Sequence, residues 1–343
     1  MNRQYLSWPS ALVLLGFGSS LAPAIAATPS LEVPAPTHDA HLISQINLPK
    51  QDVGSPNSTV GGGKRGGCLT REMSALFRPV LPIDESGTAI ANTTSSTPSL
   101  WWYVPANSAV KAELSVFTQD NTNDSLVHYQ MIDDIGSEAG LLQITLPNNA
   151  IKADNSYWWD LTLACDEIDR SGDVYLFGSI TRQNPENVSI RRNPAVIDTL
   201  ITTLLGSDSY LTLDVSEAQE LANALQMSTD DRTVTMVESR LRDHFIAVQS
   251  DYAQLSQSMQ NQNISNAELK NLKQQRSGMM LELAQLSAFF DMWGDTANFL
   301  AMGRDEHPEE WQSLLDNLFP QDDPFTEAEE DEIIRVLRMS PSL

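Results

Sequence analysis

Between residues 100 and 180 the hydrophobic positions recur at every second residue, which is the pattern of half-buried β-strands. The clearest run alternates hydrophobic and polar side chains from Val110 to Val116. Further strands are expected over residues 100–104, 126–131, 142–146, 157–165 and 174–180. Short strands separated by turn-rich segments are typical of a small antiparallel sandwich or barrel. We expect an Ig-like antiparallel β-sandwich domain over residues 68–190.

From Arg191 onward the hydrophobic positions follow the period of helices. Asn193 and Pro194 supply an N-cap and a proline at the first helical position. The strongest signal is a near-heptad seam formed by Val237, Leu241, Phe245, Val248, Tyr252, Leu255 and Met259. After a polar break, a capping box begins at Ser265, and a second seam follows that Arg276 interrupts. Two long helices joined by a short polar turn predict a long antiparallel helical hairpin.

Further helices are expected around Trp311 and Ile333, so residues 191–343 are predicted to form an α-helical domain. The predicted fold class is therefore α+β, with the β-sandwich first and the helices after it. Residues 27–67 are rich in Pro, Ser, Thr and Gly and contain few large apolar side chains. Such a segment buries too little surface to offset its ordering entropy, and we expect a disordered linker.

The first 26 residues have the pattern of a secretory signal peptide. Arg3 precedes an apolar run over residues 11–21, and Ala24-Ile25-Ala26 fits the small-x-small cleavage pattern. The run is too short for a spanning helix, although an uncleaved anchor is the alternative. We expect signal cleavage after residue 26, export to the periplasm or cell envelope, and no membrane span in the mature chain.

Charge narrows the classes of partner. The 343 residues include 45 acidic and 21 basic ones, for a formal net charge of −24. Such a chain repels nucleic-acid backbones and anionic lipid surfaces, so we expect no nucleic acid among its partners. Residues 194–343 hold 26 of the acidic residues, so the helical half is the acidic half. This favours a solvated surface, or else electrostatic docking to a basic partner.

The two cysteines, Cys68 and Cys165, lie 97 positions apart. An exported protein meets an oxidising environment, so a single disulfide between them is the simplest expectation. A pair of free thiols is the alternative.

Motifs for catalysis are missing from the sequence. It contains no G-x-S-x-G, C-x-x-C or H-E-x-x-H motif, and the five histidines lack metal-ligand spacing. We therefore expect no enzyme and no cofactor. A hydrolase would need a histidine–carboxylate pair in a cleft, and neither His128 nor His244 has an obvious partner in the sequence.

Two weaker binding signals remain. Aromatic residues on the predicted strands could form a stacking platform for a glycan if their outward members are exposed, namely Trp101, Trp102, Tyr157 and Trp158. Buried core is the commoner role of such residues. The turn after Cys165 holds Asp166, Asp169 and Asp173, which form a weak Ca²⁺ candidate beside the alternative of a solvated turn.

Several motifs occur in an ordered series. They include a glycine-rich lead-in to Cys68, a Pro98–Pro105 strand of the form Pro-x-x-Trp-x-Tyr-Val-Pro, Tyr157-Trp158-Trp159 before Cys165, and Arg170-Ser171-x-Asp173. Downstream, Phe290-Asp291-Met292-Trp293-Gly294-Asp295 precedes Trp311. The series resembles the domain of unknown function 928 family of exported cyanobacterial proteins. The resemblance implies export, paired cysteines and a β-then-α order, and it brings no assigned activity.

These observations favour an exported, non-enzymatic cell-envelope protein that acts as a protein-interaction or structural module. The expected contact is an unidentified protein, or a second copy of the chain, engaged through the helical hairpin and its acidic face. The alternative is a glycan or cell-wall ligand-binding module that uses surface aromatics of the β-sandwich.

Overall fold

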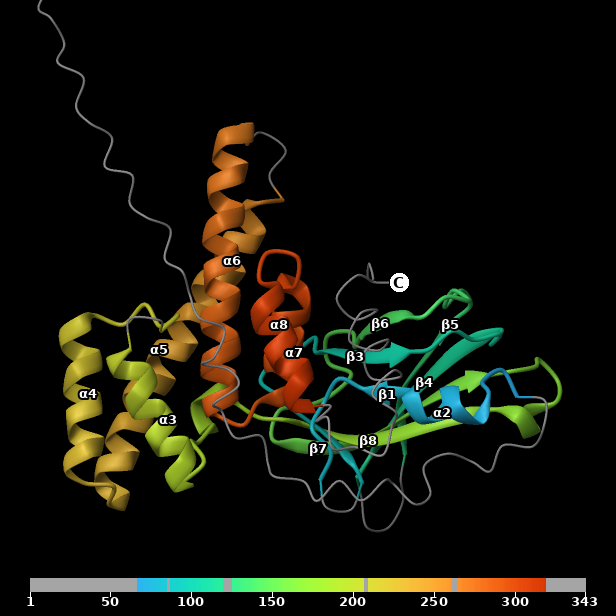
Figure 1. Ribbon diagram of the computed structural model, residues 1–343, viewed down its shortest axis with the longest axis horizontal. Helices are drawn as coiled ribbons and strands as arrows, with labels where there is room; N and C mark the ends of the chain where they lie inside the picture. The colour runs from blue at the N-terminus through green and yellow to red at the C-terminus, as the bar shows by residue number, and fades with distance from the viewer. Residues whose placement is uncertain (1–66, 85–86, 120–124, 207–208, 261–263, 319–343) are drawn as a thin grey trace, which may run out of the picture. The chain divides into compact units, whose positions relative to one another are not determined.

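The computed structural model describes residues 67–84, 87–119, 125–206, 209–260 and 264–318, and it combines two β-sheets with α-helices (Figure 1). This confirms the mixed α+β class. The expected signal peptide (1–26), nearly all of the expected linker (27–67) and the helix expected around Ile333 lie outside the described residues.

The first sheet has three strands in the order β1-β3-β6, with antiparallel pairing throughout. Their bounds are Arg78–Pro79, Ser99–Val104 and Gly140–Thr145. The second sheet has five strands in the order β2-β8-β7-β4-β5. In that order, their bounds are Ala89–Thr93, Val174–Arg182, Asn155–Ala164, Lys111–Thr118 and Leu126–Ile132.

One pairing departs from the expected antiparallel arrangement, because β2 pairs parallel to β8. The other pairs of this sheet are antiparallel, with a register shift in the β4–β5 pair between Val116 and Phe117. A parallel pair needs a long crossover connection, and the chain from β3 to β7 supplies one. The expectation of a wholly antiparallel β region was therefore wrong at this edge.

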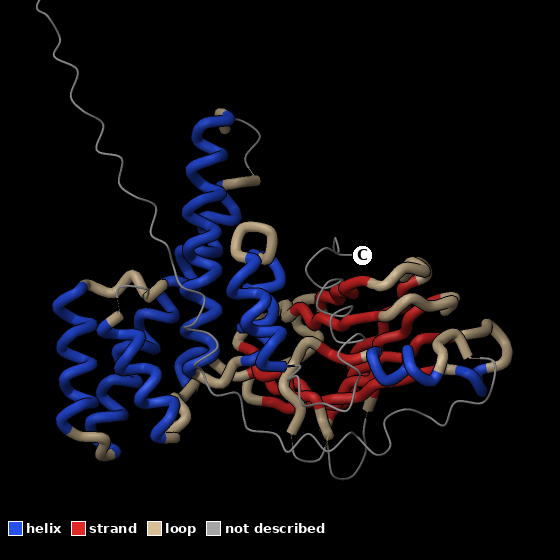
Figure 2. Tube along the Cα trace, in the orientation of Figure 1, coloured by secondary structure: helices blue, strands red, loops and turns tan. Residues whose placement is uncertain are grey.

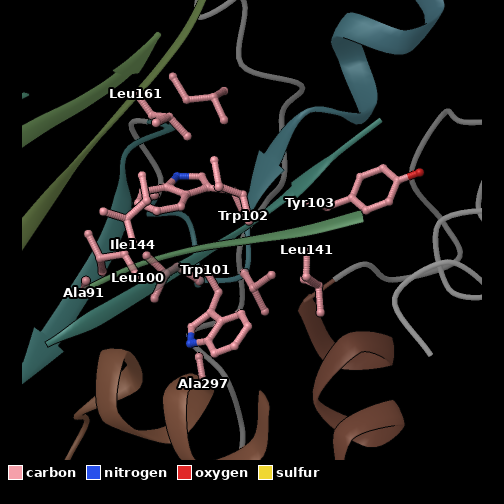
Figure 3. Packing of buried hydrophobic residues seen from close by; sticks show 14 of the residues in the cluster. Ala91, Leu100, Trp101, Trp102, Tyr103, Leu141, Ile144, Leu161 and Ala297 are labelled. Atoms are coloured by element: carbon pink, nitrogen blue, oxygen red, sulfur yellow. The ribbon is translucent and has the colours of Figure 1, made fainter. Parts of the chain in front are cut away.

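The two sheets contact each other through large buried side chains. Trp102 of β3 meets Trp159 of β7 edge to face, with ring centroids 5.5 Å apart. The preceding residue, Trp101, is covered as well (Figure 3), and all six residues of β3 are buried. The Trp101 indole Nε1 donates to Asn298 Oδ1 at 3.2 Å, and the Arg304 guanidinium lies 5.9 Å from its ring centroid.

Apart from α2, the α-helices follow the strands, as expected, and Figure 2 shows both kinds of element along the trace. Their bounds are Arg71–Leu76 (α2), Pro194–Leu205 (α3), Val215–Met227 (α4), Asp231–Ser258 (α5), Asn266–Phe289 (α6), Trp293–Gly303 (α7) and Pro308–Leu318 (α8). Short 3₁₀ helices lie at Arg170–Gly172 (η1) and Pro185–Asn187 (η2). Two predicted caps are confirmed: Asn193 accepts from the Ala195 amide, and Ser265 accepts from the Glu268 amide.

Buried hydrophobic side chains form two clusters. One includes both sheets together with residues of α6, α7 and α8, such as Leu281, Trp293 and Trp311. The other joins α3, α4 and α5 to the last turns of α6, and contains Phe245 and Phe290 with ring centroids 5.5 Å apart. The core of the β region therefore continues past residue 190 into the last helices. None of the described helices is both long and apolar enough to cross a membrane.

The stretch from residue 251 to residue 279 differs from the rest of α5 and α6, because none of its described residues is buried. We call this stretch the arm. At its base the Arg276 guanidinium donates to the Tyr252 hydroxyl at 3.3 Å and lies over the same ring. Tyr252 also meets Phe299 of α7 edge to face.

Candidate functional site

Strand alternation divides the five-stranded sheet into a buried and an exposed side. On β4, Ala112, Leu114 and Val116 are buried, while the residues between them are half-buried. The same alternation on β5, β7 and β8 leaves a continuous set of side chains uncovered. We call this set the outer face; it consists of Glu113, Ser115, Phe117, Tyr129, Met131, Trp158, Asp160, Thr162, Tyr175, Phe177 and Ser179.

Strand register aligns four of these side chains in one row across the sheet. Tyr129 is opposite Ser115, Ser115 is opposite Asp160, and Asp160 is opposite Phe177. Tyr129 is 50% exposed and Phe177 is 39% exposed. In the adjacent row Phe117 lies opposite Trp158. Aromatic rings are thus interleaved with hydrogen-bonding side chains on an accessible surface.

Asp160 is the titratable group at the centre of the row. Its partial burial raises its pKa, and the charge of Glu113 acts in the same direction. Hydrogen bonds from Thr162 and Ser115 oppose the shift because they stabilise the carboxylate. A half-buried carboxyl between aromatic rings can accept a hydrogen bond from a bound ligand whose apolar part contacts the rings.

The predicted stacking platform needs correction, since three of its four residues are buried. Trp101, Trp102 and Tyr157 are at most 5% exposed. Only Trp158, which is half-buried, lies on the outer face. The reason is geometric: successive side chains on a strand point to opposite sides, and β3 is covered on both sides. Tyr157 further uses its hydroxyl to accept from the Lys152 amide at 3.0 Å.

Sequence reasoning missed four aromatic members of the outer face, Phe117, Tyr129, Tyr175 and Phe177. The signal that could have found three of them was the alternation itself. Phe117, Tyr175 and Phe177 lie out of phase with the hydrophobic positions predicted for the core, so an aromatic residue there is placed on the exposed side. Tyr129 gave no such signal, because no buried phase is predicted for residues 126–131; its register opposite Ser115 places it on this side.

The aspartates predicted as a weak Ca²⁺ site instead form the hydrogen bonds of a turn. Asp166 Oδ1 accepts from the amides of Ile168 and Asp169, both at 2.8 Å, and Asp169 Oδ1 accepts from the Ser171 amide at 3.0 Å. The two amides lower the pKa of Asp166, and the side-chain hydroxyl and amide of Ser171 lower the pKa of Asp169. In the described part of the chain, no group of three or more His, Cys, Asp or Glu side chains is arranged to hold a metal. The aspartates therefore shape the turn.

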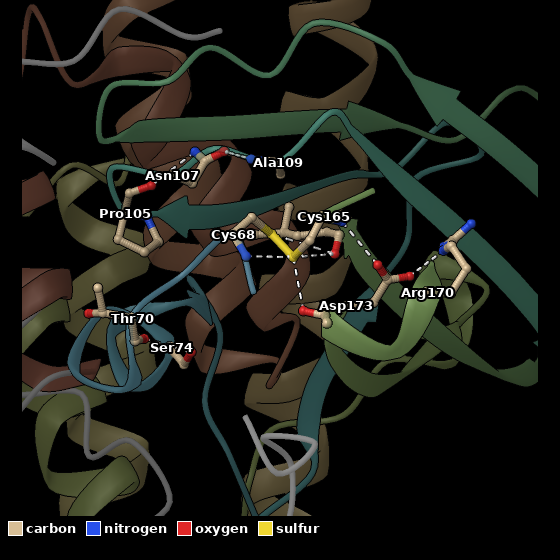
Figure 4. Close-up of a disulfide and its surroundings, with 11 residues drawn as sticks. Cys68, Thr70, Ser74, Pro105, Asn107, Ala109, Cys165, Arg170 and Asp173 are labelled. Carbon is tan, nitrogen blue, oxygen red and sulfur yellow. Dashed lines mark hydrogen bonds and ion pairs between the residues drawn. A yellow bond between two sulfur atoms is a disulfide. The ribbon is translucent and has the colours of Figure 1, made fainter. Parts of the chain in front are cut away.

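The disulfide between Cys68 and Cys165 is confirmed, and the same turn packs beside it (Figure 4). Asp173 Oδ1 accepts from the Cys165 amide at 3.0 Å, and its other oxygen pairs with Arg170. Arg170 also makes a bidentate pair with Glu113 of β4, with Nη2–Oε2 at 2.8 Å. The Arg170 hydrogen bonds lower the pKa of Glu113 to about 2. Asp173 and Arg170 thus link the disulfide and its turn to Glu113 on the outer face.

Asp295 at the start of α7 is a buried anchor between the helices and β2. Its Oδ1 accepts from Thr93 Oγ1 at 2.5 Å, and its Oδ2 accepts from the Thr94 amide at 2.7 Å and the Thr94 hydroxyl at 2.8 Å. Gln249 of α5 donates to that hydroxyl at 2.7 Å. Burial raises the pKa of Asp295, while the threonine hydrogen bonds oppose the shift. Asp295 therefore has a structural role: it holds α7 against the end of β2.

The neighbouring glycine explains how closely α7 approaches β2. A Cβ atom at Gly294 would lie 2.9 Å from the carbonyl oxygen of Asn92. The segment 290–295, which carried part of the family resemblance, is thus a docking element.

The structure also supplies a histidine–carboxylate pair that the sequence did not reveal. His244 Nε2 lies 2.7 Å from Glu282 Oε1, and Glu282 is buried. The same carboxylate accepts from the Thr212 amide at 2.6 Å and from its hydroxyl at 2.9 Å. The Glu282 carboxylate is engaged by His244 of α5 and by Thr212 of the segment before α4. We therefore assign the histidine–carboxylate pair a structural role that holds these segments together.

The fold and the outer face define a disulfide-linked α+β protein with one accessible, aromatic-rich sheet surface. Residues 60–194 match the family model described as Domain of Unknown Function (DUF928), so the chain carries a domain of this family. The match spans both cysteines, both sheets and the outer face, and ends at the start of α3. The likeness expected for residues 290–315 lies beyond the matched segment and stays a prediction. No curated protein matches the chain.

Proposed function

We propose that this chain is an exported, non-enzymatic cell-envelope protein that binds a protein partner through the outer face. The carrying observation is the exposed row of Tyr129, Asp160 and Phe177 with the neighbouring Trp158. Contiguous exposed apolar surface marks binding sites in soluble proteins, and Tyr, Trp, Phe and Met are the residue types enriched at interfaces.

Two observations favour action outside the cytoplasmic membrane. The signal-peptide pattern predicts export to the periplasm or cell envelope. The disulfide between Cys68 and Cys165 is the kind of bond that persists in oxidising compartments. The family description transfers no activity, so the proposal rests on the chain's own residues.

The finer fold that we propose is sandwich-like in its β region, with an antiparallel hairpin of α5 and α6. The contact between Trp102 and Trp159, from different sheets, supports the first part. For the hairpin, Tyr252 late in α5 contacts Arg276 early in α6, whereas His244 contacts Glu282 further along α6. Contact positions that run in opposite directions are what an antiparallel pair requires.

The sequence predicts that the hairpin engages the partner, whereas the distribution of exposed apolar side chains favours the outer face. No described residue of the arm is among the exposed large hydrophobic side chains, whereas β5 and β8 supply Tyr129, Met131, Tyr175 and Phe177. Seam residues of α5 such as Phe245 and Val248 are buried in the second cluster. The part of the apolar seam from Val237 to Val248 is therefore already occupied within the chain.

A glycan or cell-wall polymer is the second candidate ligand for the same face. Ser115, Asp160 and Thr162 alternate with aromatic side chains across the strands. Sugar rings pair an apolar face with hydroxyl groups, so they fit a surface on which aromatic rings and hydrogen-bonding groups are interleaved. Trp158 is the member of the predicted stacking platform that lies on this face.

Affinity capture from the native envelope tests the proposal with three tagged forms of the exported chain. These are the wild type, Phe177→Lys on the outer face, and Met227→Lys as a matched control, since Met227 is 87% exposed on α4. We expect one protein to be captured by the wild type and the control and lost with Phe177→Lys. Equal capture by all three forms would remove the outer face as the site. Co-sedimentation with insoluble wall polymer that Trp158→Ala abolishes would favour the second candidate.

A further inference from the structure

We propose that the outer face binds an arginine side chain of its partner, with the guanidinium paired to Asp160 among the rings of Phe177 and Trp158. This inference rests on the proposed function, because it concerns the same face, and it names the chemical group that the partner inserts there. Aromatic rings alone would fit many ligands, so the choice of arginine depends on the carboxylate between them.

The two carboxylates of the outer face differ in their partners. Glu113 is held by cations of its own chain, since Arg170 makes a bidentate pair with it and Lys111 Nζ lies 2.8 Å from its Oε1. No Lys, Arg or His side chain of the described residues forms an ion pair with Asp160. The sheet therefore presents one carboxylate that is neutralised within the chain and one that is open to a cation from outside.

The contacts that Asp160 does make are with hydroxyl groups. Thr162 Oγ1 donates to Asp160 Oδ1 at 3.5 Å, which is long for a hydrogen bond between oxygens, and the Ser115 side chain also bonds to the carboxyl group. Burial raises the pKa of Asp160, and the charge of Glu113 adds to this shift. Charge-assisted hydrogen bonds are roughly twice as strong as neutral ones, so a cation would stabilise this carboxylate more than the hydroxyl groups do.

Two aromatic rings flank Asp160 closely enough to contact the same cation. Phe177 lies directly opposite Asp160 in the antiparallel pair of β7 and β8, where Cβ atoms are about 4.5–5.5 Å apart. Trp158 lies two residues before Asp160 on the same side of β7, roughly 7 Å along the strand. Cations are attracted to aromatic faces within about 6 Å of the ring centroid. Phe177 is exposed and Trp158 half-buried, so a partner side chain can reach both rings.

Arginine fits this arrangement better than lysine does. Its planar guanidinium can donate two parallel hydrogen bonds to a carboxylate and stack on a ring, whereas an ammonium is a strongly hydrated point charge. The chain itself uses arginine in both ways: Arg170 pairs with Glu113 through two nitrogens, and Arg304 lies 5.9 Å from the Trp101 ring centroid. The formal net charge of −24 further favours the approach of a basic partner.

Fluorescence anisotropy with a short labelled peptide, Gly-Leu-Arg-Leu-Gly, tests the inference on the full exported chain. A matched peptide carries citrulline, which has the shape of arginine without its charge. The protein is used as wild type, Asp160→Asn and Asp198→Asn, since Asp198 is exposed on α3 and its replacement removes the same charge. We expect the wild type and Asp198→Asn to bind the arginine peptide alike, and Asp160→Asn to bind it about tenfold more weakly. The citrulline peptide should bind the wild type more weakly by a similar factor.

Three results would overturn the inference: equal binding of the two peptides, equal binding by the wild type and Asp160→Asn, and no binding of either peptide up to about 1 mM. Circular dichroism checks that Asp160→Asn is folded, and the citrulline comparison needs only the wild type. The affinity capture with Phe177→Lys scores the proposed function separately. A partner that is lost with Phe177→Lys but retained with Asp160→Asn would keep the outer face as the binding surface and overturn the arginine site alone.

Discussion

Trp158 and Trp159 are neighbours on β7, yet Trp159 is 1% exposed and packs edge to face on Trp102, while Trp158 lies on the outer face opposite Phe117. Strand alternation thus splits one aromatic motif into a part that holds the sheets together and a part that is free to bind.

The two tryptophans should differ in their contribution to stability. Trp159→Ala removes a buried ring between the sheets, so we expect it to lower the free energy of unfolding by about 3–5 kcal/mol. Trp158→Ala leaves that contact intact and should cost about 1 kcal/mol or less. Urea unfolding followed by circular dichroism measures both. Equal losses would contradict the assignment of the two faces.

The disulfide should stabilise the β region. It closes a loop of 97 positions, for which chain entropy predicts an upper value of about 4–5 kcal/mol. We expect Cys165→Ser to lower the free energy of unfolding by a few kcal/mol, and the double variant with Cys68→Ser to match it. Reductant should lower the stability of the wild type and leave the double variant unchanged. A wild type insensitive to reductant would show that the bond contributes nothing.

Glu113 should make the protein more stable as the pH rises through the acid range. Its folded pKa of about 2, set chiefly by Arg170, lies below the ordinary glutamate value of 4.5. A depressed folded pKa stabilises above the unfolded pKa, and this contribution is lost as the pH falls toward 2. The difference in unfolding free energy between wild type and Glu113→Gln should therefore grow from pH 2 to about 5 and then stay constant. A difference independent of pH would contradict the pairing.

Asp295 should show the opposite pH dependence. Its folded pKa is raised by burial, so ionisation above the ordinary value of 3.8 reduces its contribution to stability. Asp295→Ala leaves the donors of Thr93 and Thr94 unsatisfied and should cost about 2 kcal/mol or more. That loss should be greatest in acid and smaller at neutral pH, measured by urea unfolding. Asp305→Ala, at an exposed position, is the control and should change little.

The arm should be dispensable for folding. Replacing residues 253–275 by a short Gly/Ser linker keeps Tyr252 and Arg276, whose contact shows that the two ends lie close together. No described arm residue is buried, so the thermal midpoint should change little. Leu283→Ala, at a fully buried position of α6, is the contrasting variant and should lower it clearly. A deletion that unfolds the chain would contradict the assignment of the arm.

Local patterns predicted the elements well. Alternation located the strands from β3 to β8, and capping residues located the starts of α3 and α6. Strand β2 was missed because Ala89–Thr93 is short and its last two residues are polar; Thr93 is buried against Asp295, 202 positions away. Contacts at that separation leave no periodic signal.

The sequence predicted that the candidate site contains aromatic residues, but it did not predict which of them are exposed. Aromatic strands indicated a possible binding surface, but choosing between Tyr157 and Trp158 requires knowing which side of the sheet is covered. For Trp101 that information lies in α7, since Asn298 and Arg304 cover its ring. No pattern within β3 could show this.

The most direct test of the central claim is the affinity of the purified chain for the partner that the wild type captures. Hot-spot aromatic positions at interfaces contribute about 2 kcal/mol or more, roughly a 30-fold change in Kd. We predict a loss of that order for Phe177→Lys and no measurable change for Met227→Lys. Equal affinity of the wild type and both variants would contradict the outer face as the binding surface.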